Sequence, residues 1–185
     1  MIAARHLASA AVLALAFAST ACVGAGHSIN AYGGTRFLEA DDWDDLDNPV
    51  VYGLDGVLKV NLPWVNIEGG WFHTDNEEGD VGAVTDAELG VDEYFVGVRV
   101  TPWKILLEPY GSIGVTWVDS ELDAGATDDS DEVLAYYLRL GAAFTISFFR
   151  IGLDGRAVFG SDVDLDTIET DVDGYQLTAF VGVGF

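Results

Sequence analysis

The chain has 185 residues, with 31 Asp or Glu against 8 Lys or Arg, so its formal net charge at pH 7 is −23. This acidity argues against nucleic-acid binding, which needs a basic surface for the phosphate backbone. Its single Cys excludes an internal disulfide framework and a cysteine-based zinc site.

Residues 1–25 have the layout of a secretory signal peptide. A short polar start is followed by an apolar stretch, residues 7–18, and then by small residues. Cleavage after Ala21 or after Ala25 fits the small residues required at the cut. We therefore expect residues 26–185 to form the exported domain. A retained membrane anchor is less favoured, because the apolar stretch falls short of the ~20 residues of a spanning helix.

Cys22 offers an alternative at the same place. It follows Ser-Thr-Ala directly, so a lipoprotein signal would make it the modified N-terminus. The Leu usual three residues upstream is replaced here by Ser19. Cys22 is thus a candidate lipidation site, while ordinary cleavage is favoured.

The remainder of the chain alternates apolar with polar or small residues at a period of two. The alternating segments are about as long as the ~9–11 residues that a tilted membrane strand needs. We predict eight strands: Ile29–Leu38, Val50–Val60, Trp64–Thr74, Glu93–Thr101, Leu106–Val118, Val133–Ile146, Arg150–Gly160 and Gly174–Phe185.

The connections between these strands alternate in kind. Three are short, at residues 61–63, 102–105 and 147–149. The other four, counted together with Glu93 at the end of the second, carry 27 of the 31 acidic residues and no Lys or Arg. Short turns at one end and long loops at the other are typical of an up-and-down transmembrane β-barrel. An even number of strands places both chain ends on the short-turn side.

The two faces of the predicted strands differ in composition. One parity, such as Tyr52, Leu54 and Leu58 on the second strand, carries no charge. This suits contact with hydrocarbon, where a charge at the midplane costs ~2–4 kcal/mol. The opposite parity collects glycines and ten charged residues: Arg36, Asp55, Lys59, Glu68, Arg99, Glu108, Arg139, Arg150, Asp154 and Arg156.

Alternation alone does not decide which face points inward, so a soluble lipocalin-like barrel is the alternative. Glycines on the charged face favour a narrow filled lumen, in which small residues must stand beside large ones. Aromatic residues such as Trp64, Trp103 and Trp117 cluster near strand ends, as expected of interfacial girdles. Both features favour an apolar outer wall.

The last strand alternates towards a terminal aromatic residue through Leu177, Ala179, Val181, Val183 and Phe185. This resembles the C-terminal assembly signal of bacterial outer-membrane β-barrels. Residues 29–185 as a whole resemble the small OmpA- and OmpX-type barrels. The resemblance implies a monomeric eight-stranded antiparallel barrel in a bacterial outer membrane, with periplasmic termini. It also implies contact with outer-membrane lipids, lipopolysaccharide and, through the last strand, the barrel-assembly machinery.

The lumen of an eight-stranded barrel is just wide enough for side chains to fill. Ten charged groups in this space must pair, because an unpaired buried charge is costly. Lys59, Glu68, Arg99 and Glu108 are expected at similar heights with alternating signs. We predict an ion-paired lumen acting as a structural plug; a narrow channel or small-molecule transporter is the alternative.

The acidic connections predict a solvated, repulsive surface or an adaptation to high salt. A sharper hypothesis is loose binding of Ca²⁺ or Mg²⁺, which would bridge lipopolysaccharide phosphates. The EF-hand pattern is absent, because its Gly and Glu positions hold Thr167 and Asp173. The candidate ligands are the alternating acids Asp162, Asp164, Asp166, Asp171 and Asp173.

No catalytic site is predicted. A serine hydrolase needs Ser, His and an acid together, and only His27 and His73 follow the signal segment. His27 precedes the first strand, and His73 lies near a loop without Ser. The sequence therefore favours a structural or surface-interaction scaffold over an enzyme, including a lipid-modifying one.

Overall fold

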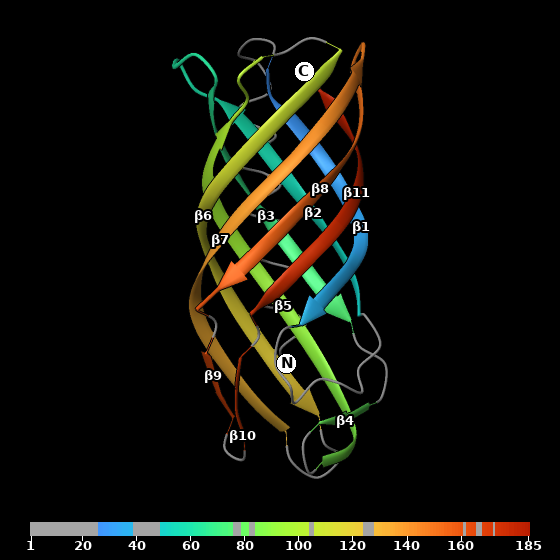
Figure 1. Ribbon diagram of the computed structural model, residues 1–185, viewed down its shortest axis with the longest axis vertical. Helices are drawn as coiled ribbons and strands as arrows, with labels where there is room; N and C mark the ends of the chain where they lie inside the picture. Colours follow the sequence, from blue (N-terminus) through green and yellow to red (C-terminus); the bar gives the residue numbers. More distant parts are fainter. Residues whose placement is uncertain are drawn as a thin grey trace.

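The computed structural model describes residues 26–38, 49–75, 79–81, 84–103, 106–123, 128–160, 162–165, 168–171 and 173–185. Within them the chain is all β, and its long strands wrap into a closed antiparallel barrel (Figure 1). The wall consists of β1 (Ser28–Leu38), β2 (Val50–Lys59), β3 (Val65–Asp75), β5 (Val84–Val100), β6 (Leu107–Asp123), β7 (Asp128–Ile146), β8 (Phe149–Phe159) and β11 (Gly174–Gly184). Three short strands, β4 (Gly79–Val81), β9 (Asp162–Leu165) and β10 (Ile168–Asp171), lie in the connections.

Every wall strand pairs with two neighbours. β1 pairs with β11 from Ser28↔Gly184 to Leu38↔Gly174. β3 pairs directly with β5, although the short strand β4 lies between them in the sequence. Because the sheet closes on itself through β3 and β5, the wall has no free edge to pair with another chain. All pairings within the wall are antiparallel. The predicted eight-stranded antiparallel barrel is confirmed. No helix in the described residues is long and apolar enough to cross a bilayer.

The barrel has a turn end and a loop end, at opposite extremes of its long axis (Figure 1). At the turn end, Ser147 and Phe148 form a two-residue hairpin between β7 and β8. Ser147 has a positive φ of 60°, as hairpins whose twist matches the strands require. Gly26 and Phe185 also meet there, where the Gly26 N–H donates to the Phe185 carbonyl at 2.9 Å.

Three wall strands extend further towards the loop end than the sequence predicted. β5 begins at Val84 instead of Glu93, β6 continues to Asp123, and β7 begins at Asp128. Acidic residues assigned to loops therefore lie on paired strands, as in Asp119↔Glu132. The apolar alternation marks only the part of a strand that faces lipid, whereas backbone hydrogen bonds continue the hairpin beyond it.

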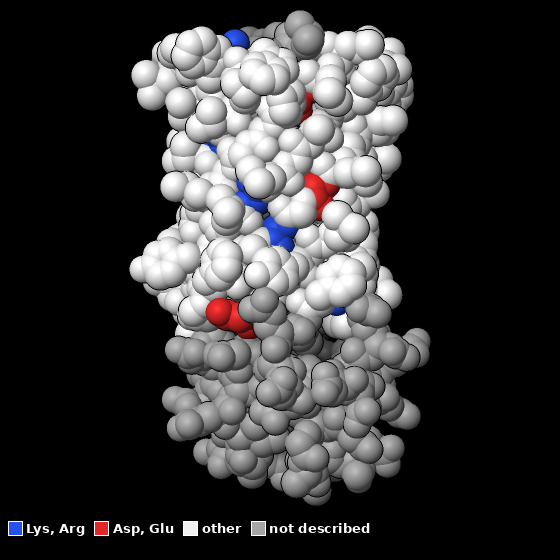
Figure 2. All heavy atoms as spheres, viewed as in Figure 1, with Lys and Arg blue, Asp and Glu red and all other residues white. Residues whose placement is uncertain are grey.

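The outer wall is apolar and the interior is charged. Leu140 and Leu153 are 62% and 64% exposed, whereas Arg139 is 0% exposed. Figure 2 shows a face on which the described side chains are almost all uncharged. This arrangement excludes the soluble alternative, because a lipocalin-like barrel places its apolar residues inside.

Candidate functional site

The barrel interior holds a group of paired charges at mid-height. We call Asp55, Glu68, Arg99, Arg139 and Asp154 the central cluster; all are buried. Arg99 donates from Nε to Glu68 Oε2 at 2.5 Å and from Nη2 to Asp55 Oδ2 at 2.9 Å. Arg139 bridges the two aspartates, at 3.0 Å to Asp55 Oδ2 and 2.6 Å to Asp154 Oδ2. The cluster thus joins five different strands.

Neutral side chains satisfy the remaining carboxylate oxygens of the central cluster. Each carboxylate accepts a tyrosine hydroxyl: Asp55 from Tyr32 at 2.7 Å, Glu68 from Tyr137 at 2.8 Å and Asp154 from Tyr110 at 2.7 Å. Asn30 and Thr178 add bonds to Asp55 and Asp154 at 2.6 and 2.7 Å. Such saturation offsets the desolvation cost of buried charges.

A second group lies closer to the loop end. We call Glu93, Arg36 and Arg156 the loop-side cluster. Glu93 is 0% exposed; it accepts from Arg36 Nη1 at 2.5 Å and forms an ion pair with Arg156. Gln176 Nε2 donates to the same carboxylate at 3.0 Å. One carboxylate therefore holds two guanidinium groups.

An aromatic layer separates the two clusters. The rings of Phe72 and Phe95 stack with their centroids 5.4 Å apart. Arg156 lies 5.2 Å from each centroid, while Arg139 lies 5.6 and 5.9 Å away. Guanidinium groups at these distances are attracted by the ring faces. The layer and the two clusters together pack the lumen.

The charges of this interior balance. The central cluster has three acids and two arginines, and the loop-side cluster has one acid and two arginines. Four carboxylates therefore face four guanidinium groups. In a buried setting this balance matters, since an excess charge would lack compensation. The arrangement pairs each of the four carboxylates with at least one arginine.

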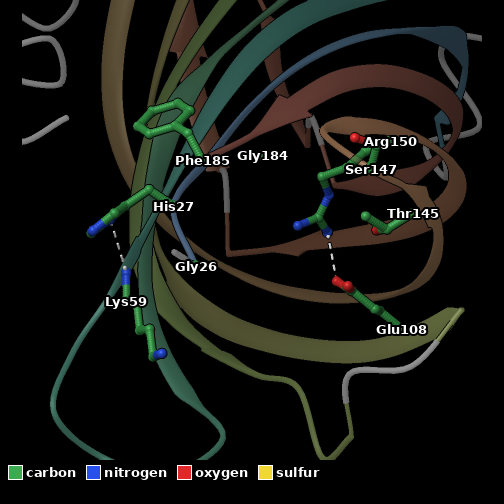
Figure 3. Close-up of a pocket in the computed structure, with 9 residues that line it drawn as sticks. All are labelled: Gly26, His27, Lys59, Glu108, Thr145, Ser147, Arg150, Gly184 and Phe185. Atoms are coloured by element: carbon green, nitrogen blue, oxygen red, sulfur yellow. Dashed lines mark hydrogen bonds and ion pairs between the residues drawn. The ribbon is translucent and has the colours of Figure 1, made fainter. Parts of the chain in front are cut away.

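The structure divides the ten predicted lumen residues into two sets. Seven belong to the two clusters, whereas Glu108 and Arg150 pair with each other at the turn end, 3.3 Å apart. Lys59 is exposed at that end, where its backbone N–H donates to His27 Nδ1 at 3.4 Å (Figure 3).

The alternating ring expected from Lys59, Glu68, Arg99 and Glu108 does not form. Strand register explains the difference. Arg99 lies opposite Ser112, so Glu108 is four residues nearer the turn end. Lys59 lies opposite Asn66, two residues nearer the turn end than Glu68. Counting from the turns ignores this stagger between neighbouring strands.

Glu93 is the main interior residue missing from the predicted lumen set, because it was counted with the acids of the second connection although it also begins the predicted strand Glu93–Thr101. It lies six residues from Arg99 on the same strand, and an even spacing places both side chains on one face. Parity along the strand could have identified it. The tyrosine partners carried no comparable signal, because tyrosines also face outward, as Tyr52 and Tyr136 do.

The remaining predicted residues lie elsewhere. Two predicted features lie outside the described residues: the segment 1–25, which contains Cys22 and both cleavage sites, and Asp166. The side chains of Asp162, Asp164 and Asp171 are not described either. Asp173 accepts from the Gly160 N–H at 3.1 Å. Among the described residues no group of three or more His, Cys, Asp or Glu could hold a metal ion. On β11, Leu177, Ala179 and Val181 are exposed, as is Phe185 beyond it.

His73 lies on the outer wall near the loop end. Its Nδ1 is 2.9 Å from Asp92 Oδ1, which also accepts from Trp71 Nε1 at 2.7 Å. The Tyr52 ring lies 5.2 Å away. A polar pair among aromatic rings is typical of a membrane–water interface.

The family model for the outer membrane protein beta-barrel domain matches residues 4–185. No curated protein is significantly similar in sequence. Among solved structures, Neisserial surface protein A from Neisseria matches with a TM-score of 0.66 and 11% identity, over 88% of this chain and 100% of that one. Ail, the attachment invasion locus protein of Yersinia pestis, matches with 0.59 and 14%, over 88% and 99%. The N-terminal β-barrel domain of Pseudomonas aeruginosa OprF matches with 0.55 and 10%, over 88% and 100%. At such identities the structures show a shared fold.

Proposed function

This chain belongs to the family of outer membrane protein β-barrel domains, and on that basis we propose that it is a non-conducting scaffold that presents an acidic surface outside the cell. The proposal has two parts, a closed lumen and an acidic loop end. It assigns the chain no catalytic activity.

The packed, charge-balanced interior is the observation that carries this proposal. A permeant ion would have to pass between Phe72 and Phe95 and separate guanidinium groups from their carboxylates. Breaking a buried ion pair by removing one partner costs about 3–5 kcal/mol, so opening several pairs together is strongly unfavourable. A rigid plug stabilises the barrel without any transport role.

We propose that the signal segment is cleaved after Ala21 or Ala25 and that the turn end of the mature barrel faces the periplasm. Outer-membrane barrels have short periplasmic turns and long external loops. The segments 39–49, 75–92, 119–132 and 161–173 hold 26 acidic residues and no Lys or Arg. They would therefore form a strongly anionic outer surface.

The sign of this surface predicts its partners. Ail has been crystallised with the heparin analogue sucrose octasulfate, which is polyanionic. The loop end of this chain would repel such a ligand. We propose instead that it attracts Ca²⁺ or Mg²⁺, hard cations that prefer carboxylate oxygens, and through them the phosphates of neighbouring lipopolysaccharide.

Conductance measurement tests the closed lumen. The chain reconstituted in planar bilayers is expected to show no stable single-channel steps. A Phe72→Ala variant, which opens the aromatic layer, serves as the comparison and is expected to increase ion leakage. Large, steady steps from the unaltered chain would favour the narrow channel instead.

Calorimetry tests the cation hypothesis. Titration of the folded protein with CaCl₂ at millimolar concentration is expected to give saturable heat and a higher unfolding temperature. Asn replacements at Asp162, Asp164 and Asp166 together are expected to reduce both signals. An unaltered unfolding temperature in the presence of calcium would contradict cation binding and favour the hypothesis that the acidic loop end is only a solvated, repulsive surface.

A further inference from the structure

Two rows of side chains cross the outer wall near the loop end, on strands that are neighbours in the sheet: β3, β5, β6 and β7. In the first row Trp71 lies opposite Tyr94, and Tyr94 lies opposite Trp117. Leu134 on β7 continues it, because it lies opposite Trp117. Trp117 and Leu134 are 41% and 50% exposed. We call these four residues the apolar row.

The second row is acidic and lies two residues nearer the loop end on β5, β6 and β7. Asp92 lies opposite Asp119, and Asp119 lies opposite Glu132. Side chains alternate between the two faces of a strand, so residues two apart point to the same side. These three residues, which we call the carboxylate row, therefore stand on the outer wall directly beside the apolar row.

The two rows are joined at Asp92. Its Oδ1 accepts a hydrogen bond from Trp71 Nε1 at 2.7 Å and lies 2.9 Å from His73 Nδ1. The Asp92 side chain nevertheless remains 27% exposed. This carboxylate is therefore held in one orientation at the boundary between the rings and the acids.

The other side of the barrel ends differently. On β1, β2, β8 and β11 the outward side chain nearest the loop end is aromatic or aliphatic and 44–60% exposed: Phe37, Val50, Phe159 and Tyr175. A boundary between lipid and water acts equally on every strand. It therefore does not account for a carboxylate row on one side of the barrel only.

The spacing of the carboxylate row limits what can occupy it. No group of three or more His, Cys, Asp or Glu in the described part of the chain could hold a metal ion. Neighbouring strands are about 4.8 Å apart, and one turn of an α-helix rises about 5.4 Å. Lysine or arginine residues on successive turns of a helix lying across the strands would thus meet successive carboxylates.

We propose that this face of β3, β5, β6 and β7 binds a basic amphipathic helix of another molecule at the membrane surface. The apolar side of the helix packs on the apolar row, and its cations lie along the carboxylate row. Helices with one basic and one apolar side lie at membrane surfaces, and complementary charge favours their approach. This interaction goes beyond the scaffold role and does not depend on binding of Ca²⁺ or Mg²⁺ by the acidic connections.

The test uses the folded chain in nanodiscs of phosphatidylcholine, a lipid without net charge. The probe is a short fluorescein-labelled helical peptide of Leu and Lys, and fluorescence anisotropy measures its binding. We expect saturable binding beyond that to empty nanodiscs. A peptide of Ser and Lys with the same charge has no apolar side, so we expect it to bind about tenfold more weakly.

Variants of the chain separate this face from the general negative charge. Combined Asp92→Asn, Asp119→Asn and Glu132→Gln is expected to weaken binding of the Leu and Lys peptide by about tenfold. The matched control replaces three acids of the connection between β1 and β2 by Asn: Asp41, Asp42 and Asp44. It changes the net charge equally and is expected to leave binding unchanged within about twofold.

A second pair of variants tests the apolar row. Trp117→Ala is expected to weaken binding severalfold, whereas Phe37→Ala, on β1 at the opposite side of the barrel, should not. The proposal is overturned if the peptide binds no better than to empty nanodiscs, since lipid would then be the occupant of this face. It is also overturned if the two triple variants weaken binding equally, because the general charge of the chain would then attract the peptide.

Discussion

The lumen and the loop end of this barrel both contain many Asp and Glu residues, but those of the lumen are buried and those of the loop end are hydrated. In the lumen, Asp55, Glu68, Glu93 and Asp154 are buried and each is matched by arginine. At the loop end, acidic residues face one another across strands, as in Asp92↔Asp119 and Asp119↔Glu132. A buried charge must be paired, whereas a hydrated charge can tolerate like neighbours at small cost.

Removing Arg139 is expected to have the largest effect on this comparison. Arg139→Ala leaves Asp55 with Arg99 and leaves Asp154 without an arginine partner among the described residues. We therefore expect a loss of about 3–5 kcal/mol in the free energy of unfolding. Urea unfolding in lipid vesicles measures it. Lys59→Ala, at the exposed turn end, is the control and should cost less than 1 kcal/mol. Equal losses in both variants would contradict the special role of burial.

Tyr137→Phe should have an intermediate effect. It removes the hydroxyl that donates to Glu68 at 2.8 Å and keeps the ring against Phe95. We expect a loss of about 1–3 kcal/mol, since a buried carboxylate oxygen is left with fewer partners. Tyr136→Phe, on the lipid-facing side of the same strand, is the matched control. The same unfolding assay should show almost no change for it.

Asp119→Asn should have the smallest effect and the opposite sign. Asp119 lies between two other acids in one row of the wall, and like charges directly opposite each other are destabilising by roughly 0.2–1 kcal/mol. We expect a stability gain of that size at low salt that disappears at high ionic strength. A loss of stability at low salt would show that the loop-end acids depend on partners as the lumen acids do.

The sequence predicted the wall well because lipid imposes a strict period of two. Arg99, Arg139 and Asp154 follow from parity alone, since a charge on the other face would enter hydrocarbon. Their partners do not follow from parity, because contacts depend on the stagger between strands. Hence Glu108 was expected beside Arg99, although Arg99 lies opposite Ser112.

The missed parts of the prediction have one physical cause. Beyond the bilayer, strands no longer need an apolar face, so β6 and β7 continue to Asp123 and Asp128 without any alternating signal. Glu93 was counted with the loop acids for the same reason, because Glu88 and Asp92 precede it in the sequence. The acidic composition of this stretch indicates a solvent-exposed loop, whereas the even spacing of Glu93 from Arg99 indicates that its side chain faces the lumen.

The contact between Arg139 and Asp55 joins residues 84 positions apart, and the contact between Gln176 and Glu93 joins residues 83 apart. Both contacts cross the interior, so we expect them to form only when the sheet closes into a barrel. The charges would thus remain hydrated until the first and last strands meet. We therefore expect water to leave the interior when β1 and β11 pair. The buried charges would then form their ion pairs at the same step at which the barrel closes in the membrane.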